Sequence, residues 1–357
     1  MIRNFFALAI LCFFVSCGDE DENTVDFDQQ SLINDLSDRV LLPTVQQSAA
    51  SIQALNGELE TFVQNPSLSS LQNAQEAWRT AMEDWKQVEL FRFEVTLRYT
   101  NQIYFSPLRL NLVERALSDD EPMTTEYVER LGAAAKGLST LEYLLFDFQN
   151  DNETVLTRFT TDELAARRLA YVEGIGNRLV VRSNELVNDW VAFLPEFKEK
   201  PVDFVVSLFA NQPLAMLEQL QNVRLGEPLG KKTGTPPLPE RVEAVYSAHS
   251  TELALSKLVG VEKIFTPQTG HTTFADYLDF VGATHGDMPL SEALTAQITA
   301  TKEALTALDN PLQVAVVEEN AKAEKAYMES QMLVVILKTE VFSALSLTIS
   351  FTDADGD

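Results

Sequence analysis

A serine and a glutamate within Gly137–Phe146 have the types and spacing that best suit chemistry. If the segment is helical, Ser139 and Glu142 stand three positions apart and share one face. Leucines and a tyrosine flank the glutamate, which predicts a partly buried carboxylate. Such a carboxylate must be paired, protonated or bound to a cation. The alternative, a surface glutamate on an amphipathic helix, stays open on spacing alone.

Other candidate pairs are less specific, and for His249 and Glu252 a coincidence is favoured over the alternative of a lone metal pair. His249 and Glu252 have the same spacing on an expected helix, but no glycine precedes them as Gly137 precedes Ser139. His271 and His285 stand beside glycines, with no partner at ligand spacing. Asp353–Asp357 resembles the start of a calcium loop but lacks the closing glutamate, which favours a solvated acidic tail.

Helices must position these side chains, because apolar residues recur every three or four positions. Ser67 is the expected N-cap of one such helix, and Thr160–Glu163 offers a capping box for another. Asn310–Pro311 predicts the start of a long helix towards Leu337. Ser346–Phe351 is the sole weak strand candidate. We therefore expect an all-α chain of about eight main helices, whose clearest apolar face comprises Leu71, Ala74, Trp78, Ala81, Met82, Trp85 and Val88.

Proline and glycine divide the helical region. The stretch 194–201 suits a domain boundary, and the longer stretch 226–239 then becomes a loop inside the second half. We expect an N-terminal helical bundle over 31–197 and a C-terminal bundle over 198–357, each resembling a four-helix bundle.

Composition excludes several classes of protein. The 357 residues carry a net charge of −26, which argues against nucleic acid as a partner. Three histidines and two cysteines do not support a zinc finger, an iron–sulfur cluster or a disulfide framework. No nucleophile elbow, phosphate-binding glycine loop or dinucleotide motif is present.

The N-terminal residues resemble an export signal. Arg3 precedes a short apolar run that ends at Ser16, and residues 1–16 therefore predict a signal peptide. Cys17 follows as in bacterial lipoproteins, where it would be lipidated. Residues 17–30 form an expected acidic tether, or a surface-export signal after lipidation. An ordinary signal peptide with a free cysteine is the alternative.

Several segments resemble the imelysin family in the right order. Gly137–Phe146 resembles its G-x-H-x-x-E motif, and Trp78–Phe93 resembles its first aromatic helix. Arg224–Gly230, Glu243–Ser250 and Thr339–Asp357 resemble its glycine loop, tyrosine–serine helix and terminus. The resemblance covers about 31–351.

The resemblance implies two helical bundles with a site in the cleft between them, and an envelope protein often tied to iron uptake. The family was first classed as metallopeptidases, although many members are better described as binding lipoproteins. Gly137 and Glu142 match the motif, whereas Ser139 replaces its histidine. Because a serine hydroxyl is a poor transition-metal ligand, this replacement argues against a peptidase zinc site and less strongly against a hard cation.

The matched segments also supply the expected ligand-binding residues. Glu89 and Arg92 are three positions apart and are expected to pair across a helical turn. The alternative is a structural polar network. The full candidate set is Glu89, Arg92, Ser139, Glu142, Glu243, Tyr246 and Ser247.

We expect a lipid-anchored outer-envelope protein, on the periplasmic side or the cell surface, that binds a ligand without catalysis. Iron, another divalent metal, haem or a protein are the ligands considered, with Glu142 as the candidate metal ligand. One alternative is a metallopeptidase that uses Glu142 as its base or ligand. The other is an interaction scaffold without a small ligand.

Overall fold

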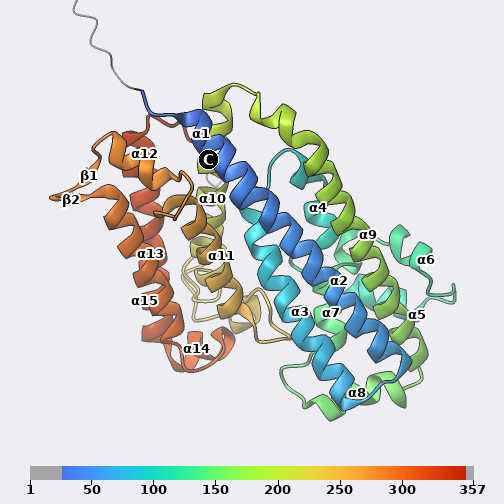
Figure 1. The fold of residues 1–357 in the computed structure, drawn as a ribbon. Coiled ribbons are helices and arrows are strands. Elements are labelled where there is room, and N and C mark those ends of the chain that lie inside the picture. The colour runs from blue at the N-terminus through green and yellow to red at the C-terminus, as the bar shows by residue number, and fades with distance from the viewer. Residues whose placement is uncertain (1–25, 351–357) are drawn as a thin grey trace, which may run out of the picture.

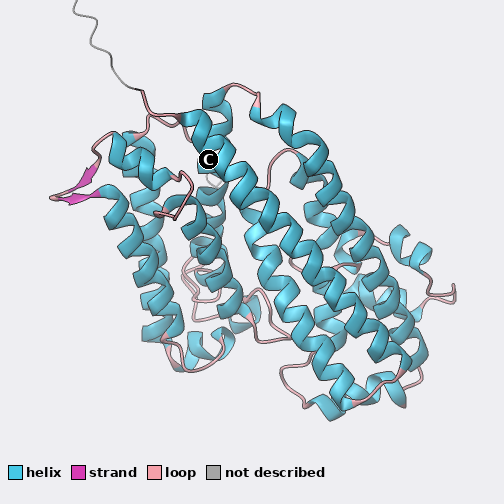
Figure 2. Cartoon of the chain, viewed as in Figure 1, coloured by secondary structure: helices cyan, strands magenta, loops and turns pink. Residues whose placement is uncertain are grey.

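The computed structural model describes residues 26–350, which are helical almost throughout (Figure 2). The predicted signal peptide, the lipidation site Cys17 and the acidic end Asp353–Asp357 lie outside the described residues. A single small hairpin is formed by β1 (Thr284–His285) and β2 (Met288–Pro289) in this part of the chain. None of the helices described is both long and apolar enough to cross a membrane.

The helices of the first half are α1 (Gln29–Asp35), α2 (Leu42–Gln64), α3 (Leu68–Val88), α4 (Val95–Ile103), α5 (Leu110–Ser118), α6 (Thr125–Arg130), α7 (Leu138–Leu145), α8 (Asn152–Thr160) and α9 (Ala165–Lys198). Those of the second half are α10 (Val202–Gln219), α11 (Ser250–Phe265), α12 (Phe274–Phe280), α13 (Leu290–Thr306), α14 (Leu312–Glu318), α15 (Asn320–Val335) and α16 (Phe342–Ala344). Shorter turns are the π-helical η1 (Leu36–Leu41), η4 (Leu220–Leu225) and η6 (Ile336–Val341), and the 3-10 turns η2 (Glu89–Phe91), η3 (Ala133–Ala135) and η5 (Pro239–Arg241).

Long helices frame the first half. The helix α2 packs against α3 and against α9, and these run side by side in Figure 1. Ser67 caps α3 as expected, and a reciprocal bond to Ser70 completes a capping box. The expected apolar face of α3 is buried, and Trp78 and Trp85 are fully enclosed. The shorter helices α4 to α8 cover the same group of helices and carry the motif segment on α7.

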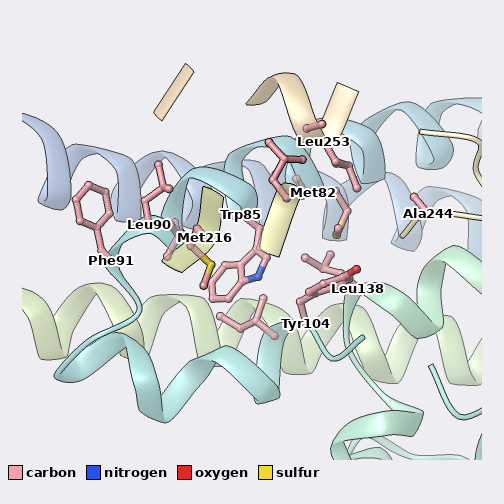
Figure 3. Packing of buried hydrophobic residues seen from close by; sticks show 14 of the residues in the cluster. Met82, Trp85, Leu90, Phe91, Tyr104, Leu138, Met216, Ala244 and Leu253 are labelled. Atoms are coloured by element: carbon pink, nitrogen blue, oxygen red, sulfur yellow. The ribbon is translucent and has the colours of Figure 1, made fainter. Parts of the chain in front are cut away.

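The second half packs against the first through α3. The helix α11 contacts α3 on one side and α13 on the other, and α13 packs on α15 (Figure 1). Figure 3 shows Trp85 surrounded by apolar side chains from both halves, among them Leu138, Met216 and Leu253. The buried hydrophobic side chains form one continuous cluster. The all-α class is confirmed, whereas the division into bundles at 31–197 and 198–357, with a cleft between them, stays a prediction.

Some local expectations were wrong. No capping box forms at Thr160–Glu163, because α8 extends to Thr160 and α9 starts only at Ala165. The helix expected from Asn310 is broken at Glu319, whose carboxylate accepts hydrogen bonds from the loop before α14. Residues 346–350, the described part of the strand candidate, form no strand. The helices also outnumber the expected eight, because loops interrupt the region between α3 and α9.

Candidate functional site

Gly137 lets the motif helix α7 start in contact with α4. Its φ is +90°, and a Cβ there would lie 2.4 Å from the carbonyl oxygen of Ile103. Both facts require glycine. The indole nitrogen of Trp78 donates to the carbonyl of Leu138 at 2.8 Å and fixes the same turn to α3. The first residue of the motif therefore serves close packing.

Ser139 forms a structural contact in place of the family's histidine. Its Oγ donates to the carbonyl of Phe105 at 2.6 Å and accepts from the Phe105 amide at 3.3 Å. The side chain is buried. These bonds join α7 to the segment that follows α4, and they use the hydroxyl as both donor and acceptor.

Glu142 is buried, so the alternative of a surface glutamate is wrong. Its Oε1 accepts hydrogen bonds from the amides of Tyr246 and Ser247 and from the Ser247 hydroxyl, each at 3.0 Å. Burial raises its pKa to about 7 although these bonds favour the charged form. The carboxylate fastens α7 to the segment 242–249, which we call the tyrosine loop.

Next to this contact lies a buried ion network centred on Lys86. The Lys86 ammonium contacts Oε1 of Glu89 at 3.0 Å and Oε1 of Glu243 at 2.7 Å. Glu243 also accepts from the Tyr104 hydroxyl at 3.0 Å and lies 3.2 Å from the Arg224 guanidinium. The network joins α3, the tyrosine loop and the turn η4, which carries Arg224.

The network contains more cations than carboxylates. The ammonium of Lys257 lies 3.4 Å from Oε2 of Glu89, yet it makes no hydrogen bond to any described residue. Burial lowers its pKa, because the charged form is desolvated. Burial opposes ionisation of Glu243 too, but Arg224 and Lys86 outweigh it and hold that pKa well below its usual value. The surrounding cations therefore keep both buried carboxylates, Glu89 and Glu243, ionised.

The prediction that Glu89 and Arg92 pair across a helical turn was wrong. The helix α3 ends at Val88, and Glu89 then enters the 3-10 turn η2. Arg92 ends this turn with φ −72° and ψ 59°, so the helical i, i+3 geometry is lost. Glu89 instead pairs with Lys86. Within residues 26–350, the buried Nε of Arg92 has no hydrogen-bond partner.

A cavity of about 450 Å³ opens beside the Glu142 contact. The rings of Tyr143 and Tyr246 meet edge to face there, with centroids 5.2 Å apart. The Tyr143 hydroxyl donates to Glu114 on α5, and Asp147 pairs with Arg158 on α8. Neighbouring residues give the cavity a mixed aromatic and charged wall. Its lining is Glu114, Tyr143, Leu144, Phe146, Asp147, Phe148, Gln149, Arg158, Arg168, Val245 and Tyr246.

The structure therefore sorts the sequence candidates into groups. Ser139, Glu142, Tyr246 and Ser247 hold the motif helix to its neighbours, and Tyr246 also lines the cavity. Glu89 and Glu243 belong to the ion network, and Arg92 joins neither. Sequence reasoning missed the cavity residues Glu114, Tyr143, Asp147, Arg158 and Arg168. Tyr143 could have been found, because it lies directly after the motif residue Glu142. The sequences of α5 and α8 contain no comparable motif that would have pointed to Glu114 or Arg158.

The histidines do not gather around this site. His249 bonds to Glu83 at 2.7 Å and lies 3.5 Å from Glu252. His285, on the hairpin strand β1, forms a hydrogen bond of 2.8 Å with Glu340 in η6. In the described part of the chain, no three His, Cys, Asp or Glu side chains are grouped so that they could hold a metal ion. A metal here would need other donors.

Comparison with known proteins settles the family. The profile described as Imelysin matches residues 41–339. The chain belongs to the imelysin family. A curated relative, iron-regulated protein A of Synechococcus elongatus, is 32% identical over 80 residues. That match covers 22% of this chain and 21% of the relative, so it spans about a fifth of either protein.

Solved imelysin structures share the fold. An imelysin-like protein from Psychrobacter arcticum matches with a TM-score of 0.73 and 17% identity, covering 90% of this chain and 97% of that one. A protein described as an iron-regulated protein A precursor from Parabacteroides distasonis matches with a TM-score of 0.74 and 18% identity. This match covers 88% of this chain and 94% of the other. At these identities the likeness concerns the fold.

Proposed function

We propose that this imelysin is a lipid-anchored ligand-binding protein of the outer envelope, with a role in iron acquisition and without catalysis. The observation that carries the proposal is the cavity beside the Glu142 contact. Its size falls within the range of about 300–1,000 Å³ typical of small-molecule sites. Convergent phenol, carboxylate and guanidinium groups give it the polar contacts that a specific ligand needs.

The motif geometry supports binding over hydrolysis. A peptidase zinc site needs about three protein ligands and an open position. Ser139 uses its hydroxyl on the backbone of Phe105, and Glu142 accepts three bonds from the tyrosine loop through one oxygen. A general base must instead reach the proton that it removes. These contacts suit a clamp that shapes the cavity wall.

The role in iron acquisition and the envelope location have separate support. One relative and one structural neighbour carry the name iron-regulated protein A, which motivates a test with iron. Cys17 after Ser16, and the acidic residues that follow it, motivate the lipid anchor. In cells, the Cys17→Ala chain should leave the membrane fraction, whereas a native chain that fractionates in the same way would refute the anchor.

A ligand panel tests the binding function. The chain that begins at Gly18 is heated with metal complexes, haem, small organic acids and peptides, beside Tyr246→Ala. We expect a ligand that raises the melting temperature of the native chain and leaves the variant unchanged. If no ligand in the panel behaves in this way, the proposal is refuted. Cleavage of a peptide library that a chelator blocks and Glu142→Ala abolishes would instead establish the metallopeptidase.

A further inference from the structure

We propose that one end of the protein docks onto a lipid bilayer with zwitterionic headgroups, through apolar side chains beside the point where the chain enters the fold. We call this surface the entry patch, and it consists of Phe27, Phe204, Tyr277, Phe280 and Val281. The inference rests on the lipid anchor of the proposed function. It adds which end of the anchored protein faces the membrane.

The entry patch is apolar and yet open to solvent. The side chains of Phe204, Phe280 and Val281 are 45%, 49% and 43% exposed. Phe280 ends α12, and Val281 follows it directly, whereas Phe274 and Leu278 of the same helix are buried. A surface helix normally has a polar outer face, but α12 carries large apolar residues on its outer side as well. Such exposed groups mark a contact surface when they gather in one place.

The first residues of the fold belong to the entry patch. The ring of Phe27 stacks on that of Tyr277, with centroids 4.2 Å apart, and lies 5.5 Å from the ring of Phe280. Gln29 donates a hydrogen bond of 2.8 Å to the Tyr277 hydroxyl. Figure 1 shows the chain entering the fold beside α12 and the start of α1. The segment that leads back to Cys17 therefore joins the fold within the patch.

The start of α10 lies at the same end. This helix packs against α1, and its first turn carries Phe204. Burial raises the pKa of Tyr277, and the negative charge of Asp203 adds to this effect, so the residue before Phe204 lies near the Tyr277 ring. Exposed aromatic rings from three separate segments of the chain therefore gather at one end of the molecule.

The length of chain before the fold keeps the entry patch near a bilayer. Asp26 stands nine positions after Cys17, the residue that the proposed anchor lipidates. Even a fully extended chain spans at most about 3.6 Å per residue, so this end stays within about 32 Å of the lipid. A short tether gives the bilayer a high effective concentration at the patch. A lipid surface is therefore the occupant that the position of the patch favours.

The charges beside the patch determine which lipid surface fits. Each exposed phenylalanine has an acidic neighbour in sequence, and the lysines at this end, Lys198 and Lys200, already pair with Asp38 and Glu94. The resulting negative border disfavours anionic lipid and also a second copy of the chain. Zwitterionic headgroups carry no net charge, and aromatic rings lie favourably at their level. The acidic neighbours are Asp26, Asp28, Asp203 and Asp279, all exposed.

Docking at this end directs the cavity away from the bilayer. The helices α5 and α8 supply Glu114 and Arg158 to the cavity wall. Both helices lie at the opposite end of the molecule from α12 (Figure 1). A docked protein therefore presents its cavity to solutes in the surrounding water.

Fluorescence quenching on vesicles tests this orientation. The chain beginning at Cys17 is coupled through that cysteine to a maleimide lipid in phosphatidylcholine vesicles with brominated acyl chains. Phe280→Trp adds an exposed indole, whereas the three native tryptophans are fully buried. We expect bromine to lower the added emission about twofold or more, because a docked ring lies at the boundary of headgroups and acyl chains. Phe148→Trp is the matched control, since Phe148 is 45% exposed and stands just before α8. Its added emission should not change.

Two further measurements separate docking from tethering alone. Phe204→Ser, added to Phe280→Trp, should restore at least half of the quenched emission, because it removes an exposed ring of the patch and no buried one. Quenching that this change leaves unaltered would overturn the proposal. Phosphatidylglycerol mixed into the vesicles should also weaken the quenching, and stronger quenching would refute the choice of a zwitterionic surface.

The remaining outcomes keep this inference distinct from the proposed anchor. Equal quenching of Phe280→Trp and Phe148→Trp, or none in either, would overturn docking at the entry patch. A dimer of the chain beginning at Gly18 that Phe280→Ser separates would assign the patch to a second copy instead. The coupled vesicles do not depend on lipidation in the cell, so failure of the Cys17→Ala fractionation test would refute the anchor alone.

Discussion

Replacing Glu142 by glutamine should stabilise the protein at alkaline pH and change it little in acid. The glutamine oxygen can accept the three hydrogen bonds that Oε1 of Glu142 accepts from Tyr246 and Ser247. The substitution removes the cost of burying a charge and keeps the shape of the side chain. Its effect should therefore depend on pH.

The size of the effect follows from the raised pKa of Glu142. Its folded-state pKa of about 7 lies above the usual 4.5, so the folded protein retains a proton that the unfolded chain has lost. Stability is then highest below pH 4.5 and falls as pH rises towards 7. At about 1.4 kcal/mol per pKa unit, the full loss amounts to about 3 kcal/mol.

Urea denaturation at pH 5 and pH 8 measures this difference. Relative to the native chain, Glu142→Gln should gain about 2–3 kcal/mol of unfolding free energy between these values. Glu153→Gln, at an exposed position on α8, controls for the loss of one negative charge. If Glu142→Gln gains the same unfolding free energy at both pH values, or is less stable than the native chain at pH 8, then burial of the ionised Glu142 does not destabilise the protein and the reasoning is refuted.

Three further substitutions test the packing around the site, each by urea denaturation. Gly137→Ala should destabilise the fold by about 2 kcal/mol or more, because its Cβ would clash with the Ile103 carbonyl at positive φ; an unchanged midpoint would contradict this. Lys86→Met should cost about 3–5 kcal/mol, since it leaves Glu89 and Glu243 without their closest cation. Lys257→Met should lower the free energy of unfolding clearly less than Lys86→Met, because the buried Lys257 ammonium makes no hydrogen bond. An equal loss in the two variants would contradict this difference between the lysines.

The helical class and the main helices were predictable because their apolar periodicity is strong. The face from Leu71 to Val88 is buried as its spacing indicates, and Ser67 caps α3. Boundaries failed where side chains distant in sequence decided them. Glu319 ends a helix by bonding to a loop ten residues earlier, which local propensity does not encode.

The site was predictable only in part. Burial of Glu142 followed from its apolar neighbours, but its partners on the tyrosine loop lie about a hundred residues away in sequence. Arg92 was misassigned because the i, i+3 rule assumes that a helix continues, whereas α3 gives way to a 3-10 turn. Glu114 and Arg158 became cavity residues through tertiary packing alone.

The tyrosine loop also determines when the cavity can exist during synthesis. Glu142 bonds to residues 104 and 105 positions later, and Lys86 bonds to Glu243, 157 positions later. Contacts of such separation form late, because closing a long chain segment costs entropy first. A chain that stopped before residue 240 would contain the motif helix and most of the cavity wall, yet it would have unpaired buried charges and no Tyr246. The wall of the cavity can therefore be completed only after Tyr246 has been synthesised.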